Sequence, residues 1–539
     1  MPRPVRVPAL WILIPFATGI ASTQLFAIPL IPSLSAAFLG LLICVRSASR
    51  PVLWKLAACL SGIFIGHGFA FTHFPSVKTE LRALPPREAN FTLEIERAFG
   101  YNPEYQSVSG LATIIETPTH LAPYKNAKVY YSLDTHETED LPIAGYSLEA
   151  KAVLRPLPRG ERIQAFHHYL HFRGVSYLFT GGEHLATTAY PSTPLSIIQK
   201  SRNWIREALL NNILPHSPYS RAYLGMMLGL KSELTPEQKD LFLKNGTMHL
   251  FAISGLHIGV IAACIHYLLT VCRIPRKSIP FLSLALILAF VLLTGGMASA
   301  WRAFLMIACL YLGSLYKRQS SPLNALAVSA LICLAIDPLQ LFLASFQMSY
   351  ATVAAILLFG VPLADRFQDK WAPFKKLPRP AWTPFHEIVY KTVRFVTSGL
   401  WVSIAAFMTS SLFGILYFNT FPILGILINL ALLPIASFAI VAGFCSLICA
   451  FLFLTPVAYL FNNAAIFLIS LIHKALETLA EYPHLSLTTQ DPNQKFLIFT
   501  SIALLAFLAF GYSRRWAIGL PSLIVPPLAI FAIGIALAY

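Results

Sequence analysis

The feature of this sequence that most restricts its fold is a series of long apolar runs, which begins near residue 9 and recurs to the C-terminus. Several runs reach the roughly 18–20 residues that an α-helix needs to cross a bilayer. They are continuous rather than alternating, which excludes a membrane β-barrel. Apolar residues make up 56% of the chain and charged residues only 12%, so a soluble globular fold is excluded. The sequence predicts a polytopic α-helical membrane protein of about 11–14 spans with one soluble insertion.

Short basic loops between the apolar runs predict the orientation of the chain. Lysine and arginine cluster there, as they do in the cytoplasmic loops of membrane proteins, and this explains most of the net charge of +16. The N-terminus and the basic loop Asp365–Arg394 are therefore expected in the cytoplasm. Residues 457–475 could also be re-entrant or interfacial. Spans are predicted at about 9–24, 26–45, 52–72, 247–271, 279–296, 300–316, 322–336, 340–362, 396–417, 420–436, 437–453, 457–475, 496–511 and 516–537.

Residues 73–193 differ in composition and pattern, because charged residues appear and polar and apolar residues alternate. Alternation with period two is typical of half-buried strands. A short helix, Glu161–Phe172, is predicted before the last strand. Five strands with one helix favour a small OB-type β-barrel outside the cytoplasm, although short alternating strands also make sandwiches. The strands are predicted at 91–99, 107–116, 127–133, 146–154 and 175–180.

A nucleic-acid surface on this insertion is one of two open interpretations. Between residues 75 and 194 there are 11 Lys/Arg and 13 Asp/Glu, which is not a basic footprint. However, Lys151–Arg173 interleaves cations with aromatic residues, the combination that single-stranded nucleic acid requires. A solvated helix face with ordinary core aromatics explains the same pattern. The candidate DNA-binding residues are Arg155, Arg159, Arg162 and Tyr169.

Residues 194–246 are predicted to form a membrane-proximal region. Ile198–Leu210 is amphipathic, and Tyr219–Leu230 is apolar enough to lie at the membrane interface. Thr235 followed by Pro236 is a helix-start pattern, and the short helix there is expected to end at Gly246.

The stretch Phe242–Val260 passes from a polar segment into an apolar run that still contains His249, Ser254, Gly255 and His257. Polar side chains are costly in hydrocarbon and usually face the interior of a bundle or a wet cavity. At helical pitch the two histidines and the serine fit one face, so we expect this face to line the functional interior. A histidine that is merely satisfied within the bundle is the competing interpretation, and two histidines cannot complete a metal site.

Further polar residues interrupt the later apolar runs. Arg302 follows Gly295 and Gly296 at the mouth of a predicted span and could pair with a phosphate, or it could extend to the interface. Three more polar residues lie within apolar runs long enough to cross a bilayer: Gln347, Ser349 and Asn429. Their side chains need hydrogen-bond partners on other helices of the bundle. The motifs HExxH, GxSxG, GxxxxGK[ST] and GxGxxG are absent, so neither an enzyme nor a cofactor is predicted.

Several of these motifs together resemble the ComEC-type competence protein family, the inner-membrane DNA channels of bacterial transformation. The match is carried mainly by Gly246-Thr-Met-His249-Leu and Ala252-Ile-Ser-Gly-Leu-His257, with support from Ser299-Ala-Trp-Arg302-Ala, Asp337-Pro338, Phe346-Gln-Met-Ser349, and Ile428-Asn429 with Pro434. The resemblance covers about 215–480, and 141–180 are similar to the end of the family's OB-like domain. Pro158-Arg-Gly-Glu replaces the Asn-Pro-Gly usual before its helix.

The resemblance implies a channel in the bacterial inner membrane that guides single-stranded DNA, with a DNA receptor protein and a cytoplasmic helicase-like ATPase as partners. Many members carry a C-terminal metallo-β-lactamase-like domain; here the sequence reaches Tyr539 directly after an apolar run, so we expect any nuclease to be separate. A transporter of another anionic or lipid-linked solute and an intramembrane hydrolase using Ser254 and His257 remain alternatives. The predicted regions are 1–72, 73–193, 194–246, 247–480 and 481–539, which correspond to N-terminal helices, β domain, membrane-proximal region, channel domain and C-terminal helices.

Overall fold

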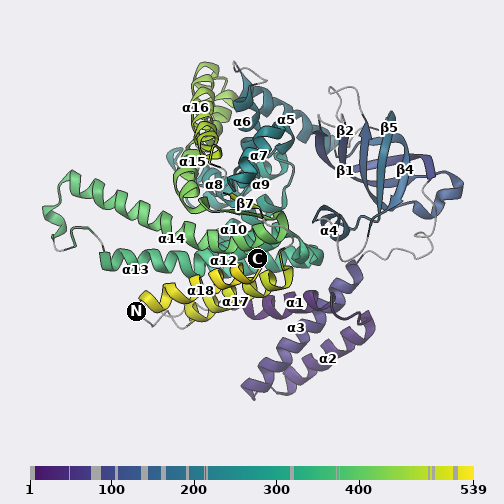
Figure 1. Ribbon diagram of the computed structural model, residues 1–539, viewed down its shortest axis with the longest axis horizontal. Helices are drawn as coiled ribbons and strands as arrows, with labels where there is room; N and C mark the ends of the chain where they lie inside the picture. Colours follow the sequence, from purple (N-terminus) through teal and green to yellow (C-terminus); the bar gives the residue numbers. More distant parts are fainter. Residues whose placement is uncertain are drawn as a thin grey trace.

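The protein consists mainly of helices, with a five-stranded barrel near its N-terminus (Figure 1). A computed structural model describes residues 7–47, 49–74, 87–102, 107–134, 144–158, 165–189, 193–211, 213, 217–315, 321–371, 373–375, 377–482, 486–488, 492–513 and 520–538. The barrel lies beside the helices, and the first three helices form a group of their own below it in the view of Figure 1.

The N-terminal helices are α1 (Leu10–Ser22), α2 (Leu30–Arg46) and α3 (Pro51–His73), which confirms the three helices predicted here. Both α1 and α2 pack on α3. The α1–α3 crossing depends on glycine, because a Cβ added at Gly66 would lie 2.2 Å from the carbonyl oxygen of Phe16, and one at Gly19 would lie 1.9 Å from that of Ile63. Only residues without a side chain allow backbones to approach this closely.

The barrel confirms the five predicted strands and the helix before the last one. Its strands close in the order β1-β2-β3-β5-β4, and all pairs are antiparallel except β3 with β5. Alternate side chains such as Phe91, Leu93 and Phe179 fill the interior, as strand geometry requires. The elements are β1 (Arg87–Asn102), β2 (Ser107–Glu116), η2 (Thr119–Tyr124), β3 (Lys128–Asp134), β4 (Ser147–Pro156), α4 (Ala165–Phe172) and β5 (Tyr177–Ala189).

Between the barrel and the later helices lie α5 (Thr193–Leu210), α6 (Pro218–Leu228), η3 (Lys231–Glu233), α7 (Pro236–Lys244) and η4 (Met248–Phe251). The predicted start of α7 is confirmed, since Thr235 and Gln238 form a capping box. The interfacial position predicted for Tyr219–Leu230 is wrong, because Ala222–Leu228 is buried in the helical core. Asn462 explains this: its amide accepts from Tyr223 Oη at 3.0 Å and donates to the Ala208 carbonyl at 2.9 Å.

The remaining helices form the main bundle. Counting α3 of the N-terminal group as well, the described residues contain seven helices that are long and apolar enough to cross a membrane. Six shorter apolar helices accompany them, so the helix count is compatible with the predicted span count. The bundle elements are α8 (Gly255–Val271), α9 (Ile279–Leu293), α10 (Ala298–Leu315), α11 (Pro322–Ile336), η5 (Pro338–Phe342), α12 (Ala344–Ala355), η6 (Ile356–Gly360), α13 (Val361–Trp371), η7 (Arg379–Ala381), α14 (Pro384–Phe418), β6 (Thr420–Pro422), α15 (Gly425–Phe451), α16 (Thr455–Ala480), β7 (Ser486–Thr488), α17 (Gln494–Ser513) and α18 (Leu520–Ala538).

Three predictions within the bundle are corrected. The two spans predicted at 420–436 and 437–453 are one helix, α15, which continues through Pro434. Much of the predicted basic loop Asp365–Arg394 is helical, because α13 extends to Trp371 and α14 begins at Pro384 after a cap at Thr383. The re-entrant alternative for 457–475 does not hold, since α16 is one helix of 26 residues.

We expect Gly66→Ala to destabilise the α1–α3 pair, because the new methyl group would collide with backbone and the helices would have to separate. Overpacking of this kind costs about 1–3 kcal/mol. The matched control is Gly259→Ala on α8, where an added Cβ meets nothing within 4 Å. Thermal unfolding of the purified chain in detergent should show a lower midpoint for the first variant only. Equal midpoints would mean that the crossing is looser than described.

Candidate functional site

The stretch singled out from the sequence is not one continuous helix. His249 lies in the short helix η4, the chain is extended at Ala252 and Ser254, and α8 begins at Gly255. The prediction that His249, Ser254 and His257 share one helical face is therefore wrong. The physical reason is that the helix starts at its cap, so positions before Ser254 do not follow the pitch of α8.

Ser254 and His257 form the cap of α8. His257 is buried at 2% exposure, and its Nδ1 lies 2.8 Å from Ser254 Oγ and accepts from the Ser254 amide at 3.3 Å. Thr383 and His386 repeat this geometry at the exposed start of α14, with distances of 2.7 Å and 3.1 Å. Because the same contact recurs at an ordinary helix start, it is explained by capping.

Three turns meet beside this cap. Ser299 at the start of α10 donates from its hydroxyl to the carbonyl of Ile253. Gly229 ends α6 with a left-handed φ of +72°, and a Cβ there would lie 2.9 Å from Met297 Sδ and 3.1 Å from Ile253. The starts of α8 and α10 and the end of α6 are therefore fixed to one another.

The two other predicted residues of this stretch have solvent-accessible side-chain positions. His249 is exposed, and its Nδ1 is 3.0 Å from the Gly246 carbonyl. Gly255 is also exposed, and an added Cβ would meet no atom within 4 Å. Of the four residues, only His257 is deeply buried.

Arg302 is the most unusual polar residue of the bundle. It lies on α10 with only 3% of its surface exposed, and its Nε and Nη1 have no hydrogen-bond partner. The guanidinium carbon lies 5.9 Å from the ring centroid of Tyr350 on α12. The Tyr350 hydroxyl donates to Cys333 Sγ at 3.4 Å and lies 3.3 Å from Ser329 Oγ. Arg302 therefore rests on a ring that α11 holds in place.

None of the ion pairs found within the described ranges involves Arg302. The groups that act on it electrostatically are Tyr350, Cys333 and a second cation, Arg173, which follows α4 of the barrel. A buried, unpaired guanidinium is costly, so this position is suited to an anion supplied from outside the chain.

The other predicted bundle residues have surroundings of their own. Gln347 accepts from Tyr417 Oη at 2.7 Å and donates to the Leu341 carbonyl at 2.9 Å, which joins α12 to α14 and η5. Ser349 is half-buried on α12, and Asn429 is half-buried on α15. Gln347 is thus satisfied within the protein.

A row of paired residues crosses all five strands of the barrel. Arg97 on β1 pairs with Leu111, Leu111 with Tyr130, Tyr130 with Leu178, and Leu178 with Arg155 on β4. Paired residues share a face of a sheet, and the three middle residues belong to the cluster beneath α4. An apolar strip with an arginine at each end therefore runs over the outside of the barrel.

Three further aromatic rings gather at Tyr130 of this strip. Phe166 and Tyr169 of α4 lie 5.2 Å from the Tyr130 centroid and 6.4 Å from the Phe99 centroid, respectively, and Phe99 lies 6.3 Å from Tyr130. Of the predicted DNA-binding residues, Tyr169 belongs to this group, and Arg155 is exposed at the end of the strip. Arg159 and Arg162 lie outside the described residues.

Two further cations, which were not predicted from the sequence, lie close together where β1 contacts η3. Burial lowers the pKa of Lys231 on η3, and the neighbouring charge of Arg97 lowers it further. Alternation along Phe91–Phe99 suggested one continuous face, but the register shifts between Ile95 and Arg97. A shift of one residue moves the following side chains to the other face of the sheet.

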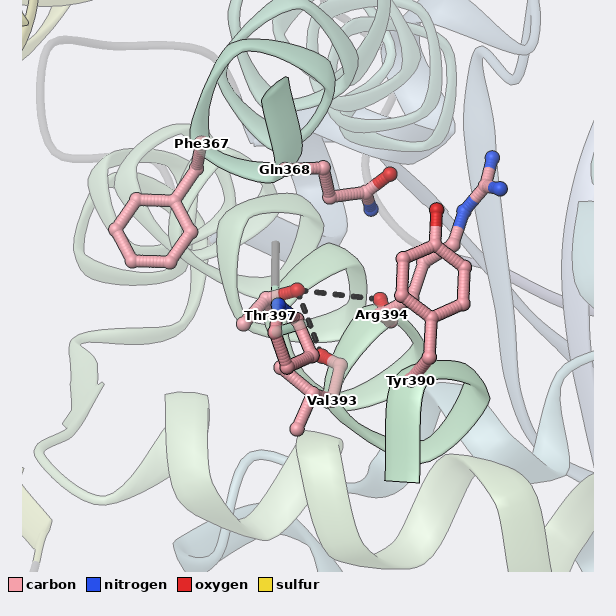
Figure 2. A pocket seen from close by; sticks show the side chains of 7 residues that line it. Phe367, Gln368, Tyr390, Val393, Arg394 and Thr397 are labelled. Carbon is pink, nitrogen blue, oxygen red and sulfur yellow. Dashed lines mark hydrogen bonds between the residues drawn. The ribbon is translucent and has the colours of Figure 1, made fainter. Parts of the chain in front are cut away.

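Figure 2 shows a cavity between α13 and α14. It offers about 10 Å³, roughly the space of one water molecule. Thr397 on its wall donates back to the carbonyl of Val393 at 2.7 Å. None of the predicted site residues lines it. We therefore do not assign it a ligand. Within the described ranges, no group of three His, Cys, Asp or Glu residues could hold a metal ion.

A bundle of apolar helices, of which seven in the described ranges are long enough to cross a membrane, joined to a small β-barrel, defines the structural class of this protein. The profile described as "Competence protein" matches residues 226–515, which is more than half of the chain. The chain belongs to this ComEC-type competence family.

Two curated relatives support the assignment. ComE operon protein 3 of Bacillus subtilis is 25% identical over 299 residues, which cover 55% of this chain and 35% of that protein. Recombination protein 2 of Haemophilus influenzae is 27% identical over 227 residues, or 40% of this chain and 27% of that protein. The matched region thus spans about a third or less of each relative. No solved structure matches the chain.

We expect His257→Gln to retain the cap of α8, because Gln238 performs the same role in the capping box of α7. The side chain introduced by His257→Leu cannot accept a hydrogen bond from the Ser254 amide. Loss of a helix cap lowers the free energy of unfolding by about 1 kcal/mol. The midpoint of thermal unfolding and hydrogen exchange at the start of α8 measure the difference. If His257→Gln is fully stable but inactive, the imidazole has a role beyond capping.

Proposed function

We propose that this protein is an inner-membrane conduit that guides single-stranded DNA into the cytoplasm during natural transformation. Membership of the competence family supports this proposal, and the observation that carries it is Arg302. DNA is a polyanion that cannot cross about 30 Å of hydrocarbon unaided. A guanidinium held inside the bundle without a carboxylate offers a contact for a passing phosphate.

Membrane insertion is part of the proposal and is supported by the surface of the helices. Large apolar side chains such as Trp11, Ile31 and Phe38 on α1 and α2 are more than half exposed, and contiguous exposed apolar surface indicates contact with lipid or another protein. We place the N-terminus in the cytoplasm and the barrel outside, because arginine and lysine flank α2 and α3 at Arg46, Arg50 and Lys55.

The division of labour between regions is also proposed. The barrel (73–193) would present the strand, residues 194–246 would connect it to the bundle, and 247–480 would form the conduit between the N-terminal helices (1–72) and the C-terminal helices (481–539). A DNA receptor protein outside and a cytoplasmic helicase-like ATPase would supply and pull the strand, since the sequence contains no Walker motif of its own.

A hydrolase is the second candidate, because Ser254 Oγ lies 2.8 Å from the His257 imidazole. The hydroxyl contacts Nδ1, the nitrogen that also accepts from the Ser254 amide, and this arrangement favours a cap. A nucleophile requires its own hydroxyl, whereas a cap accepts several residues. We expect Ser254→Asn, an equally good cap, to retain DNA uptake. Loss of uptake in a stable Ser254→Asn variant, with retention in Ser254→Thr, would favour the hydrolase.

We expect Arg302→Ala to reduce import of fluorescently labelled DNA at least tenfold, because the buried cationic contact is lost. Arg302→Lys should retain part of the activity, since it keeps the charge but not the planar fork. Arg276→Ala, an exposed arginine on the α8–α9 turn, is the control. The assay compares cytoplasmic label at matched levels of membrane-inserted protein. Undiminished import in Arg302→Ala would remove the conduit assignment from this part of the bundle.

A further inference from the structure

Helix α4 joins the barrel to the bundle, and its end lies against η5. Phe172 stacks on Phe342 at a centroid distance of 4.8 Å, and Phe74, which follows α3, contacts both rings at 6.3 Å and 6.2 Å. Leu339 and Leu343 complete this buried contact. Figure 1 shows α4 on the side of the barrel that faces the helices. The barrel is therefore docked on the bundle directly before Arg173.

Arg173 follows this docked phenylalanine and extends toward the same region. Its guanidinium carbon lies 5.5 Å from the Tyr169 ring centroid, and its Nε is buried without a hydrogen-bond partner. Its partner Tyr169 packs in a cluster that includes Phe74 and Phe342, and Tyr350, the partner of Arg302, packs in a neighbouring cluster that includes the same two phenylalanines. Arg173 and Arg302 therefore lie at the same junction of barrel and bundle, and the charge of Arg173 acts on Arg302 there. Each guanidinium thus rests on a tyrosine ring, Tyr169 for one and Tyr350 for the other.

Two like charges at one junction repel, and a bound anion would offset both this repulsion and the cost of burying Arg302. No ion pair found in the part of the chain that the structure describes involves either residue. Planar guanidinium groups match the oxygens of a phosphate. Stacking on tyrosine leaves their edges, which carry the donors, available for such a ligand.

We propose that Arg173 of the barrel and Arg302 of the bundle form one composite site that binds a single phosphodiester group of a nucleic-acid strand. The site rests on the proposed function and deepens it, because it names the place where the strand leaves the barrel and enters the bundle. The docking of Phe172 on Phe342 holds Arg173 of the barrel at the bundle, so the composite site exists only while the barrel is docked.

The test uses the purified full chain in detergent and a fluorescent oligothymidylate of about ten nucleotides, with binding measured by anisotropy over a range of salt concentrations. Arg173→Gln and Arg302→Gln should each weaken binding about tenfold at low salt and lower the salt slope by about 0.7, the value for one phosphate contact of a single strand. The double variant should lose much less than a hundredfold, because the two arginines share one ligand. Arg276→Gln is the control and should change neither quantity.

A second measurement separates the site from the folding of the variants. Arg302→Met removes an unpaired buried charge, so the unliganded variant should unfold at the same or a higher temperature than the wild type. Inorganic phosphate should raise the midpoint of the wild type, as any ligand of the native state does, but not that of Arg302→Met or Arg173→Gln.

The outcomes distinguish this proposal from the proposed function. Additive losses in the double variant, or an unchanged salt slope, would overturn the composite site even if DNA binding and import persist. Stabilisation by inorganic phosphate without any oligonucleotide binding would leave an anion site but remove the strand as its ligand. The lipid control replaces the oligonucleotide with vesicles containing phosphatidylglycerol. If the chain binds these vesicles and not the oligonucleotide, and both arginine variants lose that binding, a lipid phosphate is the ligand and the assignment to DNA is wrong.

Discussion

The interaction on which the rest of this structure depends is the contact of the buried Arg302 guanidinium with the Tyr350 ring. Tyr350 is fixed by Cys333 and Ser329 of α11, so three helices cooperate to hold one positive charge. Removing such a charge from water costs several kcal/mol, and a ring face returns only part of that cost. The one cation that acts on Arg302 within the described ranges, Arg173, has the same sign. An arginine retained only for stability would be paired, so the unpaired state of Arg302 supports the proposal that an anion binds there.

The polar residues that first attract attention in the sequence have a simpler explanation. The chain uses a Ser/Thr-x-x-His/Gln pattern at the starts of α7, α8 and α14, and each time the third residue after the cap returns a hydrogen bond to it. His257 is therefore part of a recurring way of starting a helix. Its cap still matters for the site indirectly, because Ser299 binds the Ile253 carbonyl just before it, and Ser299 begins the helix that carries Arg302.

Much of the fold could be predicted from local patterns, whereas the arrangement of the site could not. Continuous apolar runs identified the long helices, and alternation identified the five strands, because both periods are intrinsic to the backbone. The prediction divided 420–453 into two spans, whereas α15 continues through Pro434, since neighbouring helices in a bundle can support a helix across proline. The register shift after Ile95, which places Phe99 in the cluster beneath α4, has no signature in the sequence. The approach of Arg173 to Arg302 depends on how the barrel docks.

The aromatic cluster on the barrel indicates what kind of recognition this surface can support. Phe99, Tyr130, Phe166 and Tyr169 contact one another. Three of these rings are half-buried where α4 packs on the barrel, and Phe166 is the exposed one. Free stacking platforms for successive bases are therefore limited, and the groups left to act on a strand are the arginines at the edges of the cluster. Contacts to phosphate carry no sequence information. A conduit that accepts DNA of any sequence requires this property, and base-stacking alone would add affinity at the barrel without helping the strand to leave it.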